Sequence, residues 1–262
     1  MSHPDSERKP DYKEVVLSGK IAMVTGASRD IGAGIAKELA REGALVFGTF
    51  NNKKRRAEEV AAEIESQGGR IIFAQGDITQ EETRGATRAQ FDEACGHSPL
   101  HALVLNTSGE GREINVIAAN RLVDLFLPAM KPGGKIVLMN SAPAYLLAGG
   151  HIEAGDIPEF YASVAEAKAE GERTLRARMG EFQDQGVTFY SVVAPWVDGT
   201  SNVRLFERVA PGIKDTYAEL STRFNLPGTA SIEQVASRVT QLISSNQPSG
   251  YTELFMDMMS NE

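Results

Sequence analysis

The stretch IAMVTGASRDIGAGIA, residues 21–36, decides the fold. Its apolar beginning at residues 21–24 is typical of a buried strand, and it breaks into a glycine-bearing turn that leads into a helix-like stretch. Glycine lets the backbone of such a turn approach a ligand closely. The helix N-terminus then offers free N–H groups and a positive dipole end to a phosphate. A strand, a glycine turn and a helix in this order are the dinucleotide-binding arrangement.

Strand-like and helix-like stretches alternate from this turn to the end of the chain. The expected strands are residues 21–25, 44–50, 71–75, 102–106, 135–139, 187–193 and 252–256. The expected helices are residues 31–42, 54–67, 81–94, 116–130, 158–180 and 232–244. This alternation predicts an α/β fold, a doubly wound parallel sheet of about seven strands with helices on both faces.

No linker interrupts the alternation, so residues 1–262 are expected to form a single domain. The polar residues 1–17 are expected to be a loose N-terminal arm. Residues 201–228 interrupt the strand–helix pattern, and they carry aromatic and aliphatic residues among charges. We expect this insertion to be a lid over a substrate, although a pair of helices that contacts another subunit would have the same composition.

The composition narrows the classes of function. The formal net charge of −8 argues against a basic face for nucleic acid, so no nucleic-acid partner is expected. There is no run of 18 apolar residues and no apolar core of a signal peptide near the start, which predicts no membrane partner and a cytoplasmic location. The single cysteine, Cys95, excludes an internal disulfide and fits a reducing compartment. The four histidines lack metal-ligand spacing, so no metal is expected.

Residues 18–257 resemble the short-chain dehydrogenase/reductase family, which has a Rossmann-type fold. Thr25, Gly26 and Gly32 match the glycine turn of that family, T-G-x-x-x-G-x-G, whereas Asp30 replaces its middle glycine. Asp30 is either a helix cap or a carboxylate close to the pyrophosphate, whose charge Arg29 and the helix dipole would offset. The resemblance implies that a cofactor is bound by Gly26, Ser28, Arg29, Ile31, Gly32, Asn51, Asn52, Asp77, Ile78, Asn106, Thr107, Ser108, Lys168, Pro195, Val197 and Thr200.

The segment after the second expected strand indicates which dinucleotide is bound. An acidic residue there would hold the ribose 2′-hydroxyl of NAD and repel a 2′-phosphate. Residues 49–55, TFNNKKR, have no acidic residue and end in three cations. Together with Arg29, Asn51 and Asn52 they favour a phosphate, which predicts NADP(H) as the cofactor. The alternative is that residues 53–55 are only the solvated start of a helix.

The catalytic tyrosine of the family is missing from its usual place. Lys168 matches the lysine of the family's Tyr-x-x-x-Lys motif, but Val164 occupies the tyrosine position. In that motif the phenol donates a proton, while the lysine lowers the pKa of the phenol and holds the ribose. Tyr161 lies seven residues before Lys168, on the same face of the expected helix, and is our candidate for the acid. Tyr145, in the loop before that helix, is the other candidate.

Two further residues match positions of the family's active site. Ser141, just past the fifth expected strand, aligns with the catalytic serine and would hydrogen-bond a substrate oxygen. Asn115 matches the active-site asparagine of the fourth helix, although the segment between Asn106 and Asn115 is short; otherwise Asn115 would cap its helix. Trp196, the only tryptophan, replaces a glycine of a segment that borders the nicotinamide. It is expected either to wall the substrate pocket or to pack against a helix.

These residues favour an NADP(H)-dependent oxidoreductase that transfers hydride to a small organic carbonyl or imine/iminium substrate, in specialised metabolism. An iminium acceptor is already cationic and needs no acid in the Val164 position. Two alternatives stay open: a non-redox enzyme in the same pocket (an isomerase, lyase or cyclase) and an inactive dinucleotide-binding protein. Since members of the family usually associate, a homo-oligomer, either a dimer or a tetramer, is also expected.

Overall fold

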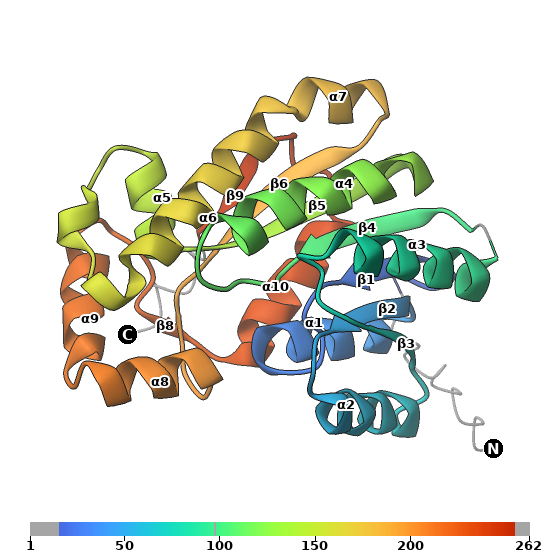
Figure 1. Cartoon of the computed structure of the whole chain (residues 1–262), viewed down its shortest axis with the longest axis horizontal. Coiled ribbons are helices and arrows are strands. Elements are labelled where there is room, and N and C mark those ends of the chain that lie inside the picture. The colour runs from blue at the N-terminus through green and yellow to red at the C-terminus, as the bar shows by residue number, and fades with distance from the viewer. Residues whose placement is uncertain (1–15, 97, 255–262) are drawn as a thin grey trace, which may run out of the picture.

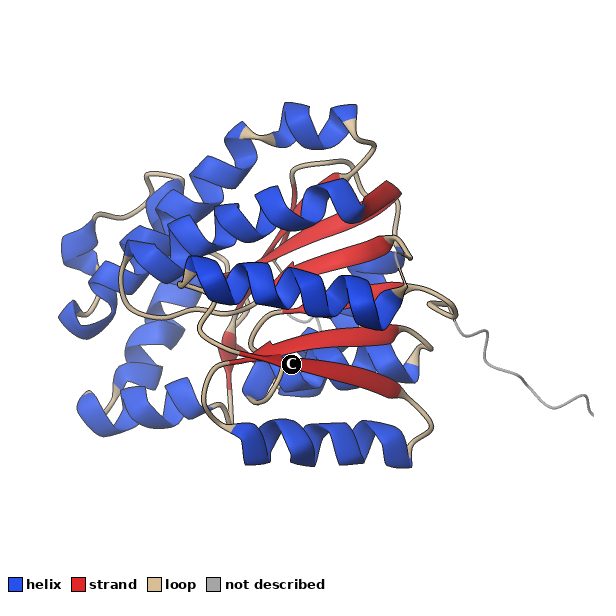
Figure 2. Ribbon diagram, turned by 45° about the vertical axis from the view of Figure 1, so that its right-hand side comes forward, coloured by secondary structure: helices blue, strands red, loops and turns tan. Residues whose placement is uncertain are grey.

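The computed structural model describes residues 16–96 and 98–254. At its centre lies a seven-stranded, wholly parallel sheet in the order β3-β2-β1-β4-β5-β6-β9 (Figures 1 and 2). Its strands are β1 (Ile21–Val24), β2 (Leu45–Phe50), β3 (Arg70–Gln75), β4 (Leu100–Leu105), β5 (Met130–Ser141), β6 (Thr188–Ala194) and β9 (Tyr251–Glu253). The prediction of a Rossmann-type α/β fold is therefore confirmed.

Helices cover both faces of this sheet (Figure 2). On one face α1 (Asp30–Arg41), α2 (Lys54–Ser66) and α10 (Ile232–Ser244) pack on the strands. On the other face lie α3 (Glu81–Cys95), α4 (Ala119–Phe126), α6 (Glu159–Ala177) and α7 (Met179–Asp184). The strands carry apolar side chains toward both layers, as in β1, where all four residues are buried. Burial of both faces is the reason that the strands could be recognised as continuous apolar runs.

A third group of elements lies beyond the carboxyl edge of the sheet. It contains α5 (Ala142–Ala148), α8 (Ser201–Val209), α9 (Ile213–Arg223) and a small parallel sheet of β7 (Trp196–Val197) and β8 (Thr229–Ala230). Figure 1 shows α9 below α5 at the left of the molecule and α8 lower still, and the apolar side chains of α5, α6 and α9 share one core cluster. The insertion at residues 201–228 is thus largely helical.

Several boundaries differ from the predicted ones. The helix expected at 116–130 begins with a π-helical turn, η1 (Glu113–Ala118), and ends in a 3-10 turn, η2 (Leu127–Ala129). The glycines and proline at 132–134, expected to end that helix, lie inside β5, whose register with β4 shifts by three residues between Leu100 and Ala102. The helix expected at 158–180 is broken between α6 and α7, and α5 was missed. Helix bounds at such irregular points follow tertiary packing rather than composition.

The expected N-terminal arm does not extend to residue 17. The side chain of Leu17 is 2% exposed, and its backbone N–H donates to the carbonyl oxygen of Glu42 at 2.9 Å. Residues 1–15 lie outside the described residues. Among the described residues, no helix combines the length and the hydropathy that a membrane span requires. In the same part of the chain no cluster of three or more His, Cys, Asp or Glu side chains is arranged to hold a metal.

His101 on β4 makes the stability of the fold depend on pH. The backbone N–H of Ile21 donates to its Nδ1 at 3.1 Å, and burial, with Lys131 and Lys20 nearby, lowers the pKa of His101 from 6.5 to about 4. Below pH 6.5 the unfolded chain therefore binds a proton that the folded chain does not. We expect the free energy of unfolding to fall between pH 6.5 and 4, with at most about 2 kcal/mol from His101 after allowance for solvent screening.

Urea unfolding at several pH values measures this loss, with His101→Asn as the control. Asparagine keeps an acceptor for Ile21 but does not titrate. The wild-type chain should lose more stability than the variant over this pH range. Parallel pH profiles of the two proteins would contradict the assignment.

Candidate active site

The glycine turn after β1 is shaped by close backbone contact. Gly26 has a φ of +67°, and a Cβ at Gly32 would lie 2.2 Å from the Gly26 carbonyl oxygen and 2.5 Å from Nδ2 of Asn106. No side chain fits there. The hydroxyl of Thr25 accepts hydrogen bonds from the backbone N–H groups of Asn106 and Thr107, both at 2.9 Å, which joins the ends of β1 and β4. The two strands on either side of the topological switch point are thereby fixed to each other.

A large cavity of about 760 Å³ opens from this turn along the carboxyl edge of the sheet. Most of the residues predicted to bind a cofactor line it: Gly26, Ser28, Arg29, Ile31, Gly32, Asn51, Asn52, Asn106, Thr107, Ser108, Lys168, Pro195, Val197 and Thr200. Asp77 and Ile78 are not in its wall. The carboxylate of Asp77 instead accepts hydrogen bonds from the backbone and hydroxyl of Thr79, at 3.0 and 2.7 Å, and Ile78 is buried in the core.

The residues at the turn end of the cavity fit a phosphorylated dinucleotide. Lys53 and Arg56 line the wall after β2 together with Arg29, so cations surround this end. Arg56 was not predicted, although its place three residues after Lys53 on the start of a helix puts it on the same side. The hydroxyl of Thr107 is buried and has no hydrogen-bond partner among the described residues. A buried hydroxyl of this kind is suited to a ligand that supplies the missing partner.

Asp30 does not cap its helix, and its carboxylate is bonded to a distant segment of the chain. The N-cap of α1 is Arg29, and Asp30 has a φ of +49°, a conformation that favours glycine. Its carboxylate accepts hydrogen bonds from the backbone N–H and hydroxyl of Ser201, at 3.1 and 3.2 Å, and lies 3.6 Å from the Arg29 guanidinium. The interpretation of Asp30 as a helix cap is therefore wrong. The expected offset of its charge by Arg29 is present.

Ser141 and Tyr161 meet at the other end of the cavity. Ser141 is the last residue of β5, and Tyr161 lies in the first turn of α6; both line the cavity wall. The phenol of Tyr161 donates to Oγ of Ser141 at 3.0 Å. Burial raises the pKa of the Tyr161 phenol, an effect partly opposed by this hydrogen bond. The phenol is therefore protonated at neutral pH and has a proton to give. Tyr145, on α5, is not in the cavity wall.

Lys168 lies two turns after Tyr161 on the same helix and also faces the cavity. Its Nζ donates to the carbonyl oxygen of Met139 at 3.0 Å. Burial lowers the pKa of Lys168 from 10.5 to about 8, and the charge of Glu172, one turn further along, acts in the opposite direction. Val164 lines the cavity between Tyr161 and Lys168. The wall of α6 thus presents a phenol, a small apolar side chain and an amine in succession.

Asn115 holds the short loop before it in place. It lies in the π-helical turn η1, a feature often found at functional sites. Its Nδ2 donates to the carbonyl oxygens of Gly109 and Gly111, both at 2.7 Å, and its Oδ1 accepts from the hydroxyl of Ser108 at 3.1 Å. The alternative that Asn115 is a helix cap is therefore wrong, because η1 begins at Glu113.

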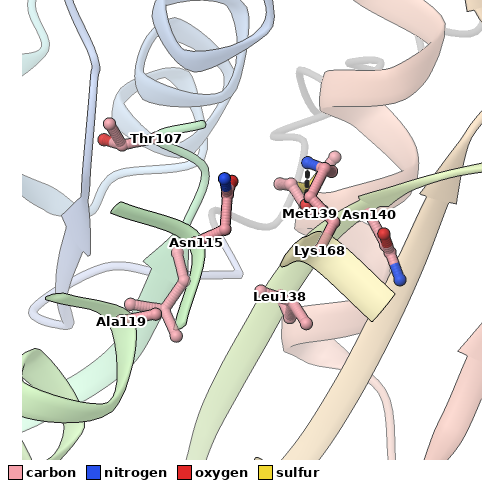
Figure 3. A pocket seen from close by; sticks show the side chains of 8 residues that line it. Thr107, Asn115, Ala119, Leu138, Met139, Asn140 and Lys168 are labelled. Atoms are coloured by element: carbon pink, nitrogen blue, oxygen red, sulfur yellow. Dashed lines mark hydrogen bonds between the residues drawn. The ribbon is translucent and has the colours of Figure 1, made fainter. Parts of the chain in front are cut away.

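Asn115 and Lys168 flank a second, much smaller cavity (Figure 3). It measures about 20 Å³, and Thr107 and Asn140 also contribute to its wall. Figure 3 shows Asn115 on one side and Lys168 with Asn140 on the other; a dashed line marks the bond from Lys168 to Met139. A space of this size with some polar groups in its wall has room for about one water molecule. Asn115 is thus separated from the large cavity by this space.

A buried carboxylate, Glu172, and its ion pair with the half-buried Arg176 support the end of β5. Asn140 accepts a hydrogen bond from the backbone N–H of Ser141 at 2.9 Å and donates one to the carboxylate of Glu172. Glu172 is 3% exposed and pairs with Arg176 at 2.7 Å, and Arg176 donates to the carbonyl oxygen of Gly250 at 2.8 Å. The sequence analysis missed this network. Its only signal was the spacing of four residues between Lys168, Glu172 and Arg176.

The helices of the insertion close the cavity with aromatic side chains. Phe206 on α8 contacts the rings of Tyr161 and Phe160, with centroids 5.4 and 5.3 Å apart. Trp196 lines the cavity and also packs on Tyr217 of α9 at 5.6 Å. Both interpretations of Trp196, as a cavity wall and as a packing residue, therefore apply. This end of the cavity is predominantly apolar, whereas the turn end is cationic.

Comparison with known proteins defines the class of protein. Residues 20–151 match the model of the short chain dehydrogenase family. The chain is 31% identical to the hydroxynaphthalene reductase arp2 of Aspergillus fumigatus over 211 residues, which are 75% of this chain and 73% of that one. The chain belongs to the short-chain dehydrogenase/reductase family. The hydroxynaphthalene reductase-like protein Arp2 of Metarhizium guizhouense is 36% identical over 144 residues, about half of each chain.

Solved structures share the fold over nearly the whole chain. The promiscuous reductase LugOII, which catalyses keto-reduction at C1 during lugdunomycin biosynthesis, superposes with a TM-score of 0.73 at 25% identity and covers 90% of this chain. A short chain dehydrogenase from Burkholderia cenocepacia in complex with NADP gives a TM-score of 0.72 at 25% identity, covering 90% of this chain and 96% of its own.

Proposed function

We propose that this chain is an NADP(H)-dependent oxidoreductase that reduces a small organic carbonyl or iminium substrate. The observation that carries the proposal is the Tyr161–Ser141 hydrogen bond at the apolar end of a cavity whose other end is a glycine turn with cations around it. The related arp2 protein is a reductase, and a structural relative is complexed with NADP. An isomerase, a lyase or a cyclase would use the hydroxyls but would have no need of the cationic end.

The cofactor would lie along the cavity from the turn to Lys168. Arg29, Lys53 and Arg56 would hold the 2′-phosphate, and the turn would receive the pyrophosphate at the N-terminus of α1. Lys168 would hold the nicotinamide ribose. Bound NADPH supplies the hydride that the substrate carbon accepts.

Ser141 and Tyr161 would then act on the substrate oxygen. The two hydroxyl oxygens lie 3.0 Å apart, close enough for both to hydrogen-bond one carbonyl oxygen and orient its carbon. As that oxygen gains the electron pair of the C=O bond, Tyr161 donates its proton and the product is an alcohol. The positive charge of Lys168 stabilises the phenolate that remains.

The family motif would place the phenol at position 164, whereas in this chain the candidate phenol is at position 161. This difference would shift the reacting centre. The two positions are about 4.5 Å apart along the helix axis, in the direction of the N-terminus of α6. Val164 is small and leaves room at the vacated position. The substrate would therefore lie closer to α8 and the aromatic side chains of the insertion, residues 201–228, which we propose acts as the substrate lid.

The preference for NADPH over NADH tests whether the cationic end of the cavity binds the 2′-phosphate. Arg56→Ala should weaken NADPH binding about tenfold, because a charge-assisted hydrogen bond to phosphate is lost, and should leave NADH binding unchanged. Arg55→Ala is the matched control, since Arg55 is largely exposed, pairs with Glu59 and does not line the cavity. Titration calorimetry with both dinucleotides measures the effect. Equal affinities of the wild-type chain for NADPH and NADH would contradict the NADP(H) assignment.

A further inference from the structure

Asp30 is an exception within the glycine turn. A non-glycine residue with a φ of +49° carries a backbone cost that glycine avoids. A residue in such a conformation persists when its surroundings fix it, and Asp30 is fixed by a partner far away in the sequence. Its Oδ1 accepts from both the backbone N–H and the hydroxyl of Ser201, a residue 171 positions later.

Ser201 is the first residue of α8, which has no acidic side chain in its own first turn. A carboxylate at a helix N-terminus is stabilised by the free N–H groups and by the helix dipole. Asp30 supplies this carboxylate from another element. Thr200 provides the N-cap itself, because its Oγ1 accepts from the backbone N–H of Val203 at 3.3 Å. The start of α8 is therefore held by one residue of its own segment and one of the dinucleotide turn.

Helix α8 also contacts Tyr161, the proposed acid, through Phe206. Phe206 lies on α8 between the Ser201 end and the helix C-terminus, and its ring contacts the rings of Tyr161 and Phe160. A shift of α8 would move Phe206 and remove the packing that fixes the phenol beside Ser141. Rings in edge-to-face contact depend on such placement.

We propose that Asp30 is a positioning residue that fastens α8 to the dinucleotide turn and thereby holds Phe206 against Tyr161. Its carboxylate accepts hydrogen bonds from Ser201 and lies beside the Arg29 guanidinium, and Asp30 also lines the large cavity. The attachment of α8 to the dinucleotide turn follows from the hydrogen bonds between Asp30 and Ser201 alone. The consequence for Tyr161 rests on the proposed function.

Two variants distinguish the effect of the Asp30 side-chain hydrogen bonds from the effect of the backbone conformation at residue 30. Asp30→Gly removes the carboxylate and introduces the residue that tolerates positive φ, so the turn itself should fold normally. Asp30→Asn keeps an acceptor at Oδ1, and asparagine also tolerates this conformation. The readout is amide hydrogen exchange, measured by mass spectrometry on the cofactor-free full chain. Peptides from Ser201–Val209 report on α8, and peptides from Lys54–Ser66 report on α2 as the internal control.

We expect exchange in α8 to be about tenfold faster in Asp30→Gly than in the wild type, with α2 unchanged and with Asp30→Asn close to the wild type. With the bicyclic ketone 2-tetralone, the KM should rise in Asp30→Gly and recover in Asp30→Asn. Three results would overturn the proposal: unchanged exchange in α8, equally faster exchange in α8 and α2, or an Asn variant as fast as the Gly variant. Because exchange is measured without turnover, an inactive enzyme would count against the proposed function and not against the fastening of α8.

Discussion

Tyr161→Phe is expected to lower kcat/KM for ketone reduction by about 10²–10⁴-fold, the usual contribution of a positioned general acid. The phenylalanine ring keeps the packing against Phe206 and loses only the hydroxyl that donates to Ser141. NADPH affinity should stay within about threefold of the wild type, because the phenol lies at the opposite end of the cavity from the cations. Initial rates of NADPH oxidation with 2-tetralone measure the first effect, and calorimetry measures the second.

The matched control is Tyr145→Phe, which removes a phenol that is outside the cavity wall. It should retain most of the activity. An iminium acceptor provides a second control, since hydride transfer to a cation needs no proton and should be far less sensitive to Tyr161→Phe. Full ketone reductase activity in Tyr161→Phe would exclude Tyr161 as the acid.

Glu172→Ala is expected to cost about 1–3 kcal/mol of folding free energy, because it leaves the buried amide of Asn140 without its acceptor, whereas Arg176 keeps Gly250 and Thr252 as partners. It should also lower the pKa of Lys168 below its value of about 8, since the charge of Glu172 raises it. The alkaline limit of activity would then move to lower pH. Urea unfolding at neutral pH measures the stability, and the pH profile of kcat/KM reports on Lys168.

Glu170→Ala is the control on the same helix. Glu170 pairs with Arg112 at the surface, where solvent screening leaves an ion pair little effect on stability. A loss of stability in Glu172→Ala no larger than in Glu170→Ala would contradict the importance of the buried network. An unchanged pH profile would contradict the effect of Glu172 on Lys168.

The fold was predictable because its signals are local. Buried parallel strands are continuous apolar runs, and the turn at Gly26 and Gly32 has a residue pattern that follows from close backbone approach. Ser141 could be placed because it ends a recognisable strand, and Lys168 because it matches the lysine of the Tyr-x-x-x-Lys motif. The irregular elements were not predictable. The π-helical turn at Asn115 and the extension of β5 through residues 130–134 depend on what packs against them, and no local composition encodes this.

The two α6 residues of the site were predictable from their spacing, whereas the cofactor-binding residues between Gly26 and Thr200 were predicted from the family resemblance. The seven-residue spacing of Tyr161 and Lys168 fixed their common helix face, and the structure places both in the cavity wall. The partner of Asp30 could not be found in this way, because Ser201 is 171 residues away and lies in a segment without a strong pattern. Glu172 was missed because a glutamate in a helix is normally solvated, and only the fold shows that it is buried.

The most direct test of the proposed reductase is transfer of deuterium from NADPH deuterated at C4 of the nicotinamide. The wild-type chain is incubated with this cofactor and with a series of bicyclic and polycyclic ketones, and the products are analysed by mass spectrometry. We predict an alcohol that carries deuterium on the former carbonyl carbon, with one NADPH oxidised for each molecule formed. Conversion of a substrate without deuterium in the product and without oxidation of NADPH would contradict the account and would favour a non-redox enzyme.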